Sequence, residues 1–126
     1  MVNKYGARKV KTPDGKVFDS RKEYNRWCEL KILEKAERIA GLKRQVKFEL
    51  VPAQRMASTE VYKAGPQKGL PKPGAVIEKA ITYVADFCYW KDGKYIVEDV
   101  KGFKTEAYKI KRKLMLWVHG IRIKEV

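Results

Sequence analysis

Two β-rich runs joined by an Asp-Gly turn constrain the fold of this chain more than any other feature. Residues 77–90 and 94–100 are rich in Ile, Val, Tyr and Phe, and Lys91-Asp-Gly-Lys94 connects them. Asp-Gly accepts the positive φ angles that a two-residue hairpin turn requires, so the sequence predicts an antiparallel hairpin here. Side chains in a strand return to the same face every two residues. The hairpin therefore determines which residues of the two runs share a face.

The N-terminal part of the sequence predicts a further hairpin followed by a helix. Ala7 to Phe18 contains Thr12-Pro-Asp-Gly, a typical turn sequence. Ser20-Arg-Lys-Glu23 then has the form of a capping box. We expect the helix to run from about Ser20 to Ala40 and to end at Gly41. Its apolar face is expected to comprise Trp27, Cys28, Leu30, Ile32, Ala36 and Ile39.

The rest of the chain predicts strands on both sides of a second helix. Gln45 to Val51 alternates as a strand and ends at Pro52, and residues 57–75, with three prolines and three glycines, read as a surface loop or flap. A helix is expected from Thr105 to His119, before Gly120 and a last strand, Ile121 to Val126. Its expected buried face is Ala107, Ile110, Leu114, Trp117 and Val118, and all three tryptophans are expected in the core.

Together these elements predict one α/β domain over residues 1–126, a mixed sheet with flanking helices, preceded by a basic hairpin at 1–19. The formal charge of +14 favours an anionic partner, with nucleic acid ahead of a membrane surface. The excess lies at the two ends, with 14 basic against 6 acidic residues in 1–47 and 8 against 4 in 98–126. No transmembrane run or signal peptide is visible, and Cys28 and Cys88 are expected as free buried thiols, so we expect a cytoplasmic protein without membrane contact.

Three residues of the central hairpin have the chemistry of a metal-dependent phosphodiesterase. Asp86 interrupts an apolar run, where a carboxylate is costly unless it is paired or binds a cation. Asp99 and Lys101 share one strand face, and the hairpin brings Asp86 beside Asp99. Two converging carboxylates favour Mg²⁺ or Mn²⁺, and a lysine beside them suits the charge of a reacting phosphate. The alternatives are an exposed cross-strand salt bridge, or Glu98 as the ligand in place of Asp99, although Glu98 is expected on the opposite face.

An Asp, a hairpin and then Asp-x-Lys before a basic helix resembles the PD-(D/E)xK nuclease superfamily, in particular small phage-encoded members similar to Holliday-junction resolvases. The resemblance implies a restriction-endonuclease-like αβββαβ core, with Asp86, Asp99 and Lys101 as catalytic residues and Asp86 and Asp99 as metal ligands. Ala85 stands where many members have a proline. The resemblance adds Glu23 as a further catalytic residue and metal ligand, while a capping role alone is the alternative. It also implies an Mg²⁺-dependent endonuclease that acts on branched DNA or recombination intermediates as a homodimer, in a bacterial or phage-infected cell.

Basic residues near this hairpin are candidates for DNA contacts. They are Lys104, Lys109, Lys111, Arg112 and Lys113 in and before the second helix, with Arg8, Lys9 and Lys11 near the N-terminus. Tyr108 is expected either to stack on a base or to pack in the core. His119 is expected to interact with its helix end rather than act as a base. A non-catalytic DNA- or RNA-binding accessory protein is the rival hypothesis, and a membrane-surface protein is a third.

Overall fold

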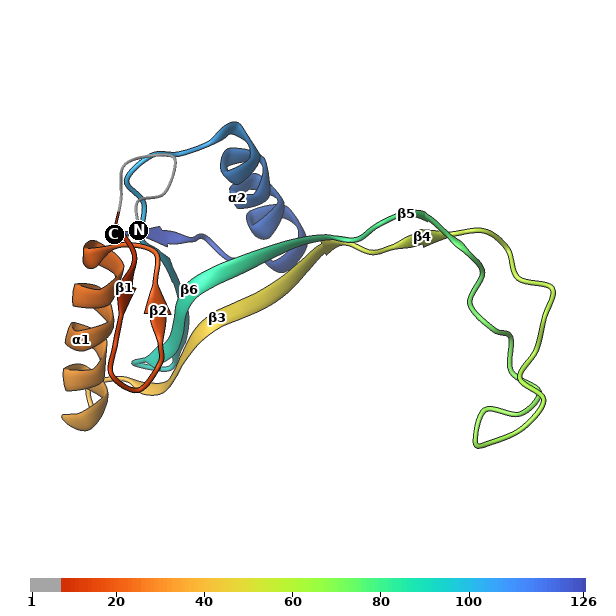
Figure 1. Cartoon of the computed structure of the whole chain (residues 1–126), viewed down its shortest axis with the longest axis horizontal. Helices are drawn as coiled ribbons and strands as arrows, with labels where there is room; N and C mark the ends of the chain where they lie inside the picture. Colours follow the sequence, from red (N-terminus) through yellow and green to blue (C-terminus); the bar gives the residue numbers. More distant parts are fainter. Residues whose placement is uncertain (1–7) are drawn as a thin grey trace.

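The computed structural model describes residues 8–126, so Ala7 and the other residues of segment 1–7 lie outside the described part. A four-stranded mixed sheet and two helices form the body of the molecule (Figure 1). The elements in chain order are β1 (Val10–Lys11), β2 (Val17–Phe18), α1 (Arg21–Lys35), β3 (Ala40–Val51), β4 (Gln54–Arg55), β5 (Val76–Glu78), β6 (Ile81–Lys91), β7 (Lys94–Asp99), α2 (Glu106–His119) and β8 (Lys124–Glu125). The predicted α/β class and the order αβββαβ after an N-terminal hairpin are confirmed.

The sheet has the order β3-β6-β7-β8, in which only the β7–β8 pair is parallel. The predicted hairpin is present, with Asp92 at φ 50° and Gly93 at φ 74° in its turn. Its register pairs Phe87 with Glu98 and Lys91 with Lys94. The crossover through α2 is what allows β8 to return parallel to β7.

Two hydrophobic cores lie on the two faces of this sheet. Under α1, Leu30 packs with Phe87 and Tyr89. Under α2, Met115 packs in a cluster with Tyr83, Ala85, Leu50 and other residues. We call these the α1 core and the α2 core.

Midway along β3 and β6, the side of each strand that packs in a given core reverses. On β3, Leu42 packs in the α1 core, but Val46, an even number of residues later, packs in the α2 core. On β6, Ala85 and Phe87 are divided in the same way. Side chains two apart would share a face in a regular strand. Gln45, at φ 53°, supplies the change of backbone direction on β3, and Asp86 lies at the corresponding position of β6.

The predicted first helix was too long. Helix α1 ends at Lys35, with Ala36 as its C-cap, because Glu37 adopts a left-handed φ of 59° and turns the chain into β3. The Glu34 carboxylate accepts a hydrogen bond from the Leu42 amide at 3.0 Å and closes this turn. Gly41 is therefore not a helix cap; it lies within β3, which begins five residues before the predicted strand.

The predicted apolar faces of the helices were partly wrong. Ile32 of α1 is exposed. In α2 the buried residues are Tyr108 and Met115. Of the predicted face only Leu114 packs against the α2 core, whereas Ala107, Ile110, Trp117 and Val118 are exposed. The period was right, but the sheet covers a different side of the helix. Trp90 is also exposed, so of the three tryptophans only Trp27 packs in a core, the α1 core.

The terminal elements follow the prediction in outline. The last strand is shorter than predicted, because only Lys124–Glu125 pair with β7. Cys28 is half-buried, Cys88 is buried, and both are free thiols as predicted. Within residues 8–126, no helix has the length and apolar character needed to cross a membrane.

A narrow arm extends from the body where β3 and β6 continue into β4 and β5 (Figure 1). The predicted continuous strand 77–90 is thus divided at Lys79–Ala80, where β5 ends and β6 begins. The predicted loop 57–75 forms the outer part of the arm, and a bridge between Val61 and Pro71 holds it closed. Gly74 permits the close approach of its two sides, because a Cβ there would lie 1.9 Å from the Met56 carbonyl oxygen.

Candidate active site

A pocket of about 410 Å³ lies where β6 and β7 separate, between the starts of α1 and α2. Asp86 comes from β6, and Asp99 and Lys101 come from the end of β7 and the residues after it. The remaining lining residues are Asp19, Gln45, Thr82, Tyr83, Val84, Thr105, Ala107, Tyr108 and Lys111. The structure therefore brings the three predicted hairpin residues together in one concave site.

Asp86 occupies the point at which the β6–β7 ladder ends. Its Oδ2 accepts a hydrogen bond from the Val100 amide at 2.8 Å, taking the place of the next backbone partner. Burial, together with the nearby carboxylates of Asp99 and Glu23, raises the pKa of Asp86 to about 8. Within residues 8–126 no salt bridge to Asp86 is found. The salt-bridge alternative holds only for Lys101 and Asp99, which pair along one segment rather than across the hairpin.

Asp99 is buried and held from two sides. Tyr83 donates a hydrogen bond to Asp99 Oδ2, and Lys101 Nζ lies 3.0 Å from Asp99 Oδ1. Within the described residues Oδ1 accepts no well-directed hydrogen bond, which leaves a buried acceptor facing the pocket. The Lys101 ammonium also lies 4.3 Å from the centre of the Tyr108 ring, which fixes it above the start of α2.

Glu23 combines capping with proximity to the pocket. Its amide donates to Ser20 Oγ at 3.1 Å, so the predicted capping interaction is present. Its carboxylate accepts from the Asp19 amide at 3.0 Å and from Gln45 Nε2 at 3.4 Å. Glu23 is buried, and this burial raises its pKa, with Asp99 contributing in the same direction.

The donor chemistry of this site fits a hard divalent cation. Burial and nearby carboxylates disfavour the charged forms of Asp86 and Glu23, and Asp99 Oδ1 has the Lys101 ammonium beside it but no well-directed hydrogen bond. A cation would stabilise all three charged forms, and oxygen ligands suit Mg²⁺. Among residues 8–126, no three or more His, Cys, Asp or Glu side chains are arranged as a group that could hold a metal ion. The carboxylates are thus neighbours rather than a closed cage.

Glu98 lies on the opposite face of β7, as strand alternation predicted. Arg26 of α1 binds both of its carboxylate oxygens at 2.8 and 2.7 Å, and the Tyr89 hydroxyl donates a further hydrogen bond. These contacts lower the pKa of Glu98 although it is fully buried. Glu98 is therefore a satisfied structural carboxylate that joins α1 to the sheet.

The predicted basic residues divide into paired and unpaired groups. Glu125 engages Lys104 at 3.4 Å and Arg112 at 3.3 Å, and Glu106 engages Lys109 at 3.2 Å. Lys111 and Lys113 have no ion-pair partner within 4.0 Å in the described part of the chain, and Lys111 lines the carboxylate pocket. Arg8 and Lys9, before β1, and Lys11, within β1, are exposed. Of these predicted basic residues, Lys111 is therefore the one that is unpaired and also lines the candidate site.

Two further predictions concern aromatic side chains. Tyr108 packs in the α2 core and its hydroxyl donates to Glu125 at 2.8 Å, so the core alternative is correct. His119 ends α2, and its Nε2 lies 2.7 Å from the Glu49 carbonyl oxygen, which ties the helix to β3. Tyr83 and Gln45 were not anticipated as site residues. Nothing in the residue types marked them, because their positions depend on the change of face at Gln45.

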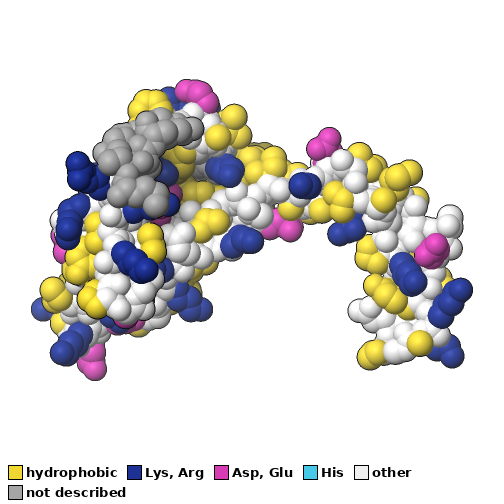
Figure 2. All heavy atoms as spheres, in the orientation of Figure 1, with side chains coloured by type: hydrophobic (Ala, Val, Ile, Leu, Met, Phe, Trp, Pro, Cys, Tyr) yellow, Lys and Arg dark blue, Asp and Glu magenta, His cyan; other side chains and the backbone are white. Residues whose placement is uncertain are grey.

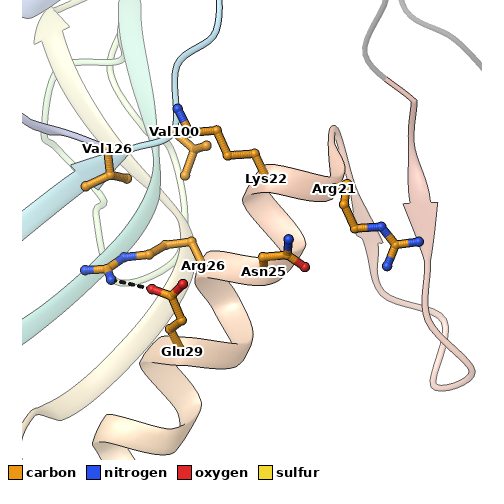
Figure 3. A pocket seen from close by; sticks show the side chains of 7 residues that line it. All are labelled: Arg21, Lys22, Asn25, Arg26, Glu29, Val100 and Val126. Carbon is orange, nitrogen blue, oxygen red and sulfur yellow. Dashed lines mark hydrogen bonds and ion pairs between the residues drawn. The ribbon is translucent and has the colours of Figure 1, made fainter.

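A larger hollow of about 530 Å³ lies between the first half of α1 and Val100 and Val126 (Figure 3). In Figure 3, Arg26 reaches Glu29 while Lys22 extends toward Val100, where its ammonium donates to the Lys101 carbonyl oxygen at 3.3 Å. The hollow contains one carboxylate side chain, which is already paired with Arg26. We therefore place the candidate site in the smaller carboxylate pocket.

Comparison with known proteins assigns a family without assigning an activity. The model of a family described as "Protein of unknown function (DUF1064)" matches residues 2–120, and the chain belongs to this family. Neither the curated proteins nor the solved structures contain a match to the chain.

Proposed function

We propose that this DUF1064 chain is a metal-dependent nuclease that hydrolyses phosphodiester bonds in DNA. The observation that carries the proposal is the convergence of Asp86, Asp99 and Lys101 at the end of the β6–β7 hairpin, with Glu23 beside them. This convergence matches the residues that the resemblance to the PD-(D/E)xK superfamily named. The +14 charge supports a nucleic acid as the substrate.

In this proposal Asp86 and Asp99 hold Mg²⁺, for which Mn²⁺ substitutes, and Glu23 assists them. When bound, the ion supplies a Lewis acid and an activated water. The chain's own residues position the reaction. Lys101, held by Asp99 and the Tyr108 ring, is placed to stabilise negative charge that develops on the phosphoryl oxygens. Asp86 is placed to hold the ion, which would stabilise the charged form that burial and the neighbouring carboxylates otherwise disfavour.

The reaction is a hydrolysis in which a water oxygen forms a bond to phosphorus and the bond from phosphorus to one sugar oxygen breaks. That sugar oxygen leaves as a hydroxyl that carries one of the water protons. Lys111 at the pocket rim is placed to bind an adjacent phosphate. Branched DNA is the first substrate to test, and a homodimer cutting two strands is the expected assembly. Both follow from the resemblance to Holliday-junction resolvases.

The direct test incubates labelled linear, forked and four-way DNAs with the protein and Mg²⁺, Mn²⁺ or EDTA. We expect cleavage with either metal and none in EDTA. Asp86→Ala, Asp99→Ala and Lys101→Ala should each abolish cleavage while retaining DNA binding. Asp92→Asn is the matched control, because it changes an exposed Asp in the turn of the same hairpin at a positive φ that Asn tolerates.

The rival function is a non-catalytic nucleic-acid-binding protein that uses the same basic surface. It predicts tight, salt-sensitive binding with no cleavage under any metal condition, and it predicts that Asp86→Ala and Asp92→Asn behave alike. That result would overturn the nuclease proposal.

A further inference from the structure

The arm is a long ribbon without a core of its own. The structure describes every residue of the arm, 52–80, and none of them is buried. Backbone hydrogen bonds hold its two sides together, from the Met56 amide to the Ala75 carbonyl oxygen at 2.9 Å and from the Tyr62 amide to the Leu70 carbonyl oxygen at 3.0 Å. A two-stranded ribbon without a core is only marginally stable by itself, and connections of this length are usually functional. We therefore expect the arm to bind a partner.

The arm is basic, and its cations are free to bind an anion. Against two glutamates it carries five basic residues, Arg55, Lys63, Lys68, Lys72 and Lys79. Within residues 8–126, none of these five forms an ion pair within 4.0 Å. Figure 2 shows Lys and Arg side chains from the root of the arm to its outer end, with open space between the outer part and the body. Unpaired cations spread along an extended element fit a chain of phosphates.

A continuous surface joins the arm to the carboxylate pocket. A largely apolar hollow of about 430 Å³ lies at the root of the arm, lined by Ala80, Ile81, Thr82, Ala107, Ile110 and Lys111. Thr82, Ala107 and Lys111 also line the carboxylate pocket. Lys79 directly precedes the hollow in the sequence, so a cation lies at each end of it. DNA bound at the pocket can therefore continue past Lys111 and Lys79 onto the arm.

The form of the arm favours duplex DNA over a single strand. The major groove is about 12 Å wide and admits a two-stranded ribbon. Surfaces that bind single strands instead present aromatic rings on which bases stack. Tyr62 is the one aromatic residue of the arm, and it is half-buried, with the Lys72 ammonium 5.8 Å from the centre of its ring. The exposed side chains of Leu70 and Ile77 suit contacts with thymine methyl groups in the groove.

We propose that the arm binds double-stranded DNA on one side of the bond to be cleaved, with its ribbon in the major groove. DNA as the partner rests on the proposed function, and the arm adds the form that this DNA takes. Fourteen residues from Pro52 to Gly65 make up the outgoing side of the arm, which spans at most about 46 Å. The bend in Figure 1 shortens this reach toward one turn of the double helix, about 34 Å. The substrate therefore has roughly one turn of duplex beside the cleaved bond, in a linear or a branched DNA.

Binding measured in EDTA tests the arm without cleavage. The arm variant combines Lys63→Ala, Lys68→Ala and Lys79→Ala, three exposed side chains whose loss should leave circular dichroism unchanged. Fluorescence anisotropy with a duplex of about 30 base pairs, roughly three turns, measures affinity across a range of salt concentrations. We expect weaker binding than wild type. The slope of log affinity against log salt should become less steep by about 2.7, the value for three lost phosphate contacts.

The matched control removes the same charge elsewhere. It combines Lys35→Ala, at the end of α1, with Lys91→Ala and Lys94→Ala, beside the β6–β7 turn, and all three lysines are exposed. The control should keep the wild-type slope, because strand β6 separates this turn from the arm. Hydroxyl-radical footprinting should then show about one turn of protected duplex, on one side, that the arm variant alone loses.

Equal affinity and slope for the arm variant and the control would overturn the proposal. So would a loss in the arm variant that is as large for a single strand of the same length. An arm that binds protein instead would give association of the chain without DNA that Leu70→Glu abolishes, beside wild-type DNA binding by the arm variant, and this too would overturn it. Failure of the nuclease proposal looks different, because cleavage would then be absent with Mg²⁺ or Mn²⁺ while the arm variant still lost affinity.

Discussion

Replacing Asp86 with Asn should make the metal-free protein more stable at neutral pH. Asp86 has its pKa raised from 3.8 to about 8 by burial and by the charges of Asp99 and Glu23. Between these two values the folded chain retains a proton that the unfolded chain has released. The free energy of unfolding therefore falls as pH rises, by about 1.4 kcal/mol per pH unit. From pH 5 to pH 7 this amounts to about 2.7 kcal/mol, which is a large part of the stability of a small domain.

Asp86→Asn should not show this loss of stability with rising pH, because its amide does not ionise. Its carbonyl oxygen can still accept the hydrogen bond from the Val100 amide. Glu23, with its raised pKa, remains in both proteins and contributes equally. Glu98 has a lowered pKa, so its stabilisation is complete above about pH 4.5 and is lost only below that range. The difference in unfolding free energy between variant and wild type should thus grow from pH 5 to pH 7.

Urea unfolding at pH 5, 6 and 7 in EDTA measures this difference, with Asp92→Asn as the control that should follow wild type. Adding Mg²⁺ should then stabilise wild type by about 2.7 kcal/mol at a hundredfold excess over its dissociation constant, and should have little effect on Asp86→Asn. The reasoning is refuted if wild-type stability in EDTA does not change between pH 5 and 7. It is equally refuted if Asp86→Asn is the less stable protein at pH 7.

Three other expectations concern residues outside the carboxylate cluster. Glu98→Gln should lower the free energy of unfolding by about 3 kcal/mol in urea titrations, because it leaves the Arg26 guanidinium without its buried partner; stability equal to wild type would contradict this. Lys111→Ala should make the slope of log affinity for DNA against log salt less steep by about 0.9, the value for one lost phosphate contact; an unchanged slope would place the contact elsewhere. Gly74→Ala should speed proteolysis within the arm while leaving global unfolding unchanged, since the added Cβ overlaps the facing strand at 1.9 Å; equal cleavage rates would show that the arm tolerates it.

The central hairpin could be predicted because its signals are local. Asp92-Gly93 specified the turn, and alternation then placed Asp99 and Lys101 on one face with Glu98 on the other. The helical spacing of apolar residues in α2 is also a local signal, and it predicted the helix correctly. The side of α2 that is buried depends on where the sheet lies, and Ile110 and Tyr108 differ in exposure for that reason alone.

The parts that could not be predicted depend on unusual backbone angles at ordinary residues. Glu37 and Gln45 both have positive φ values, which glycine adopts readily and other residues seldom do. Glu37 ends α1 earlier than predicted. At Gln45, the side chains on one side of β3 and β6 change from packing in one core to packing in the other. Tyr83 entered the candidate site through that change, so no pattern in the sequence marked it.

The change of face at Gln45 also bears on how the protein opens. The α1 core and the α2 core share a sheet but have different side chains, so they are natural candidates for separate cooperative units in hydrogen exchange. Glu23 belongs to the helix of one unit, Tyr108 to the helix of the other, and Asp86 lies at their boundary. Local unfolding of either unit would therefore disassemble the pocket. Metal binding, which needs the whole pocket, should slow amide exchange in both units together and couple two halves that otherwise open independently.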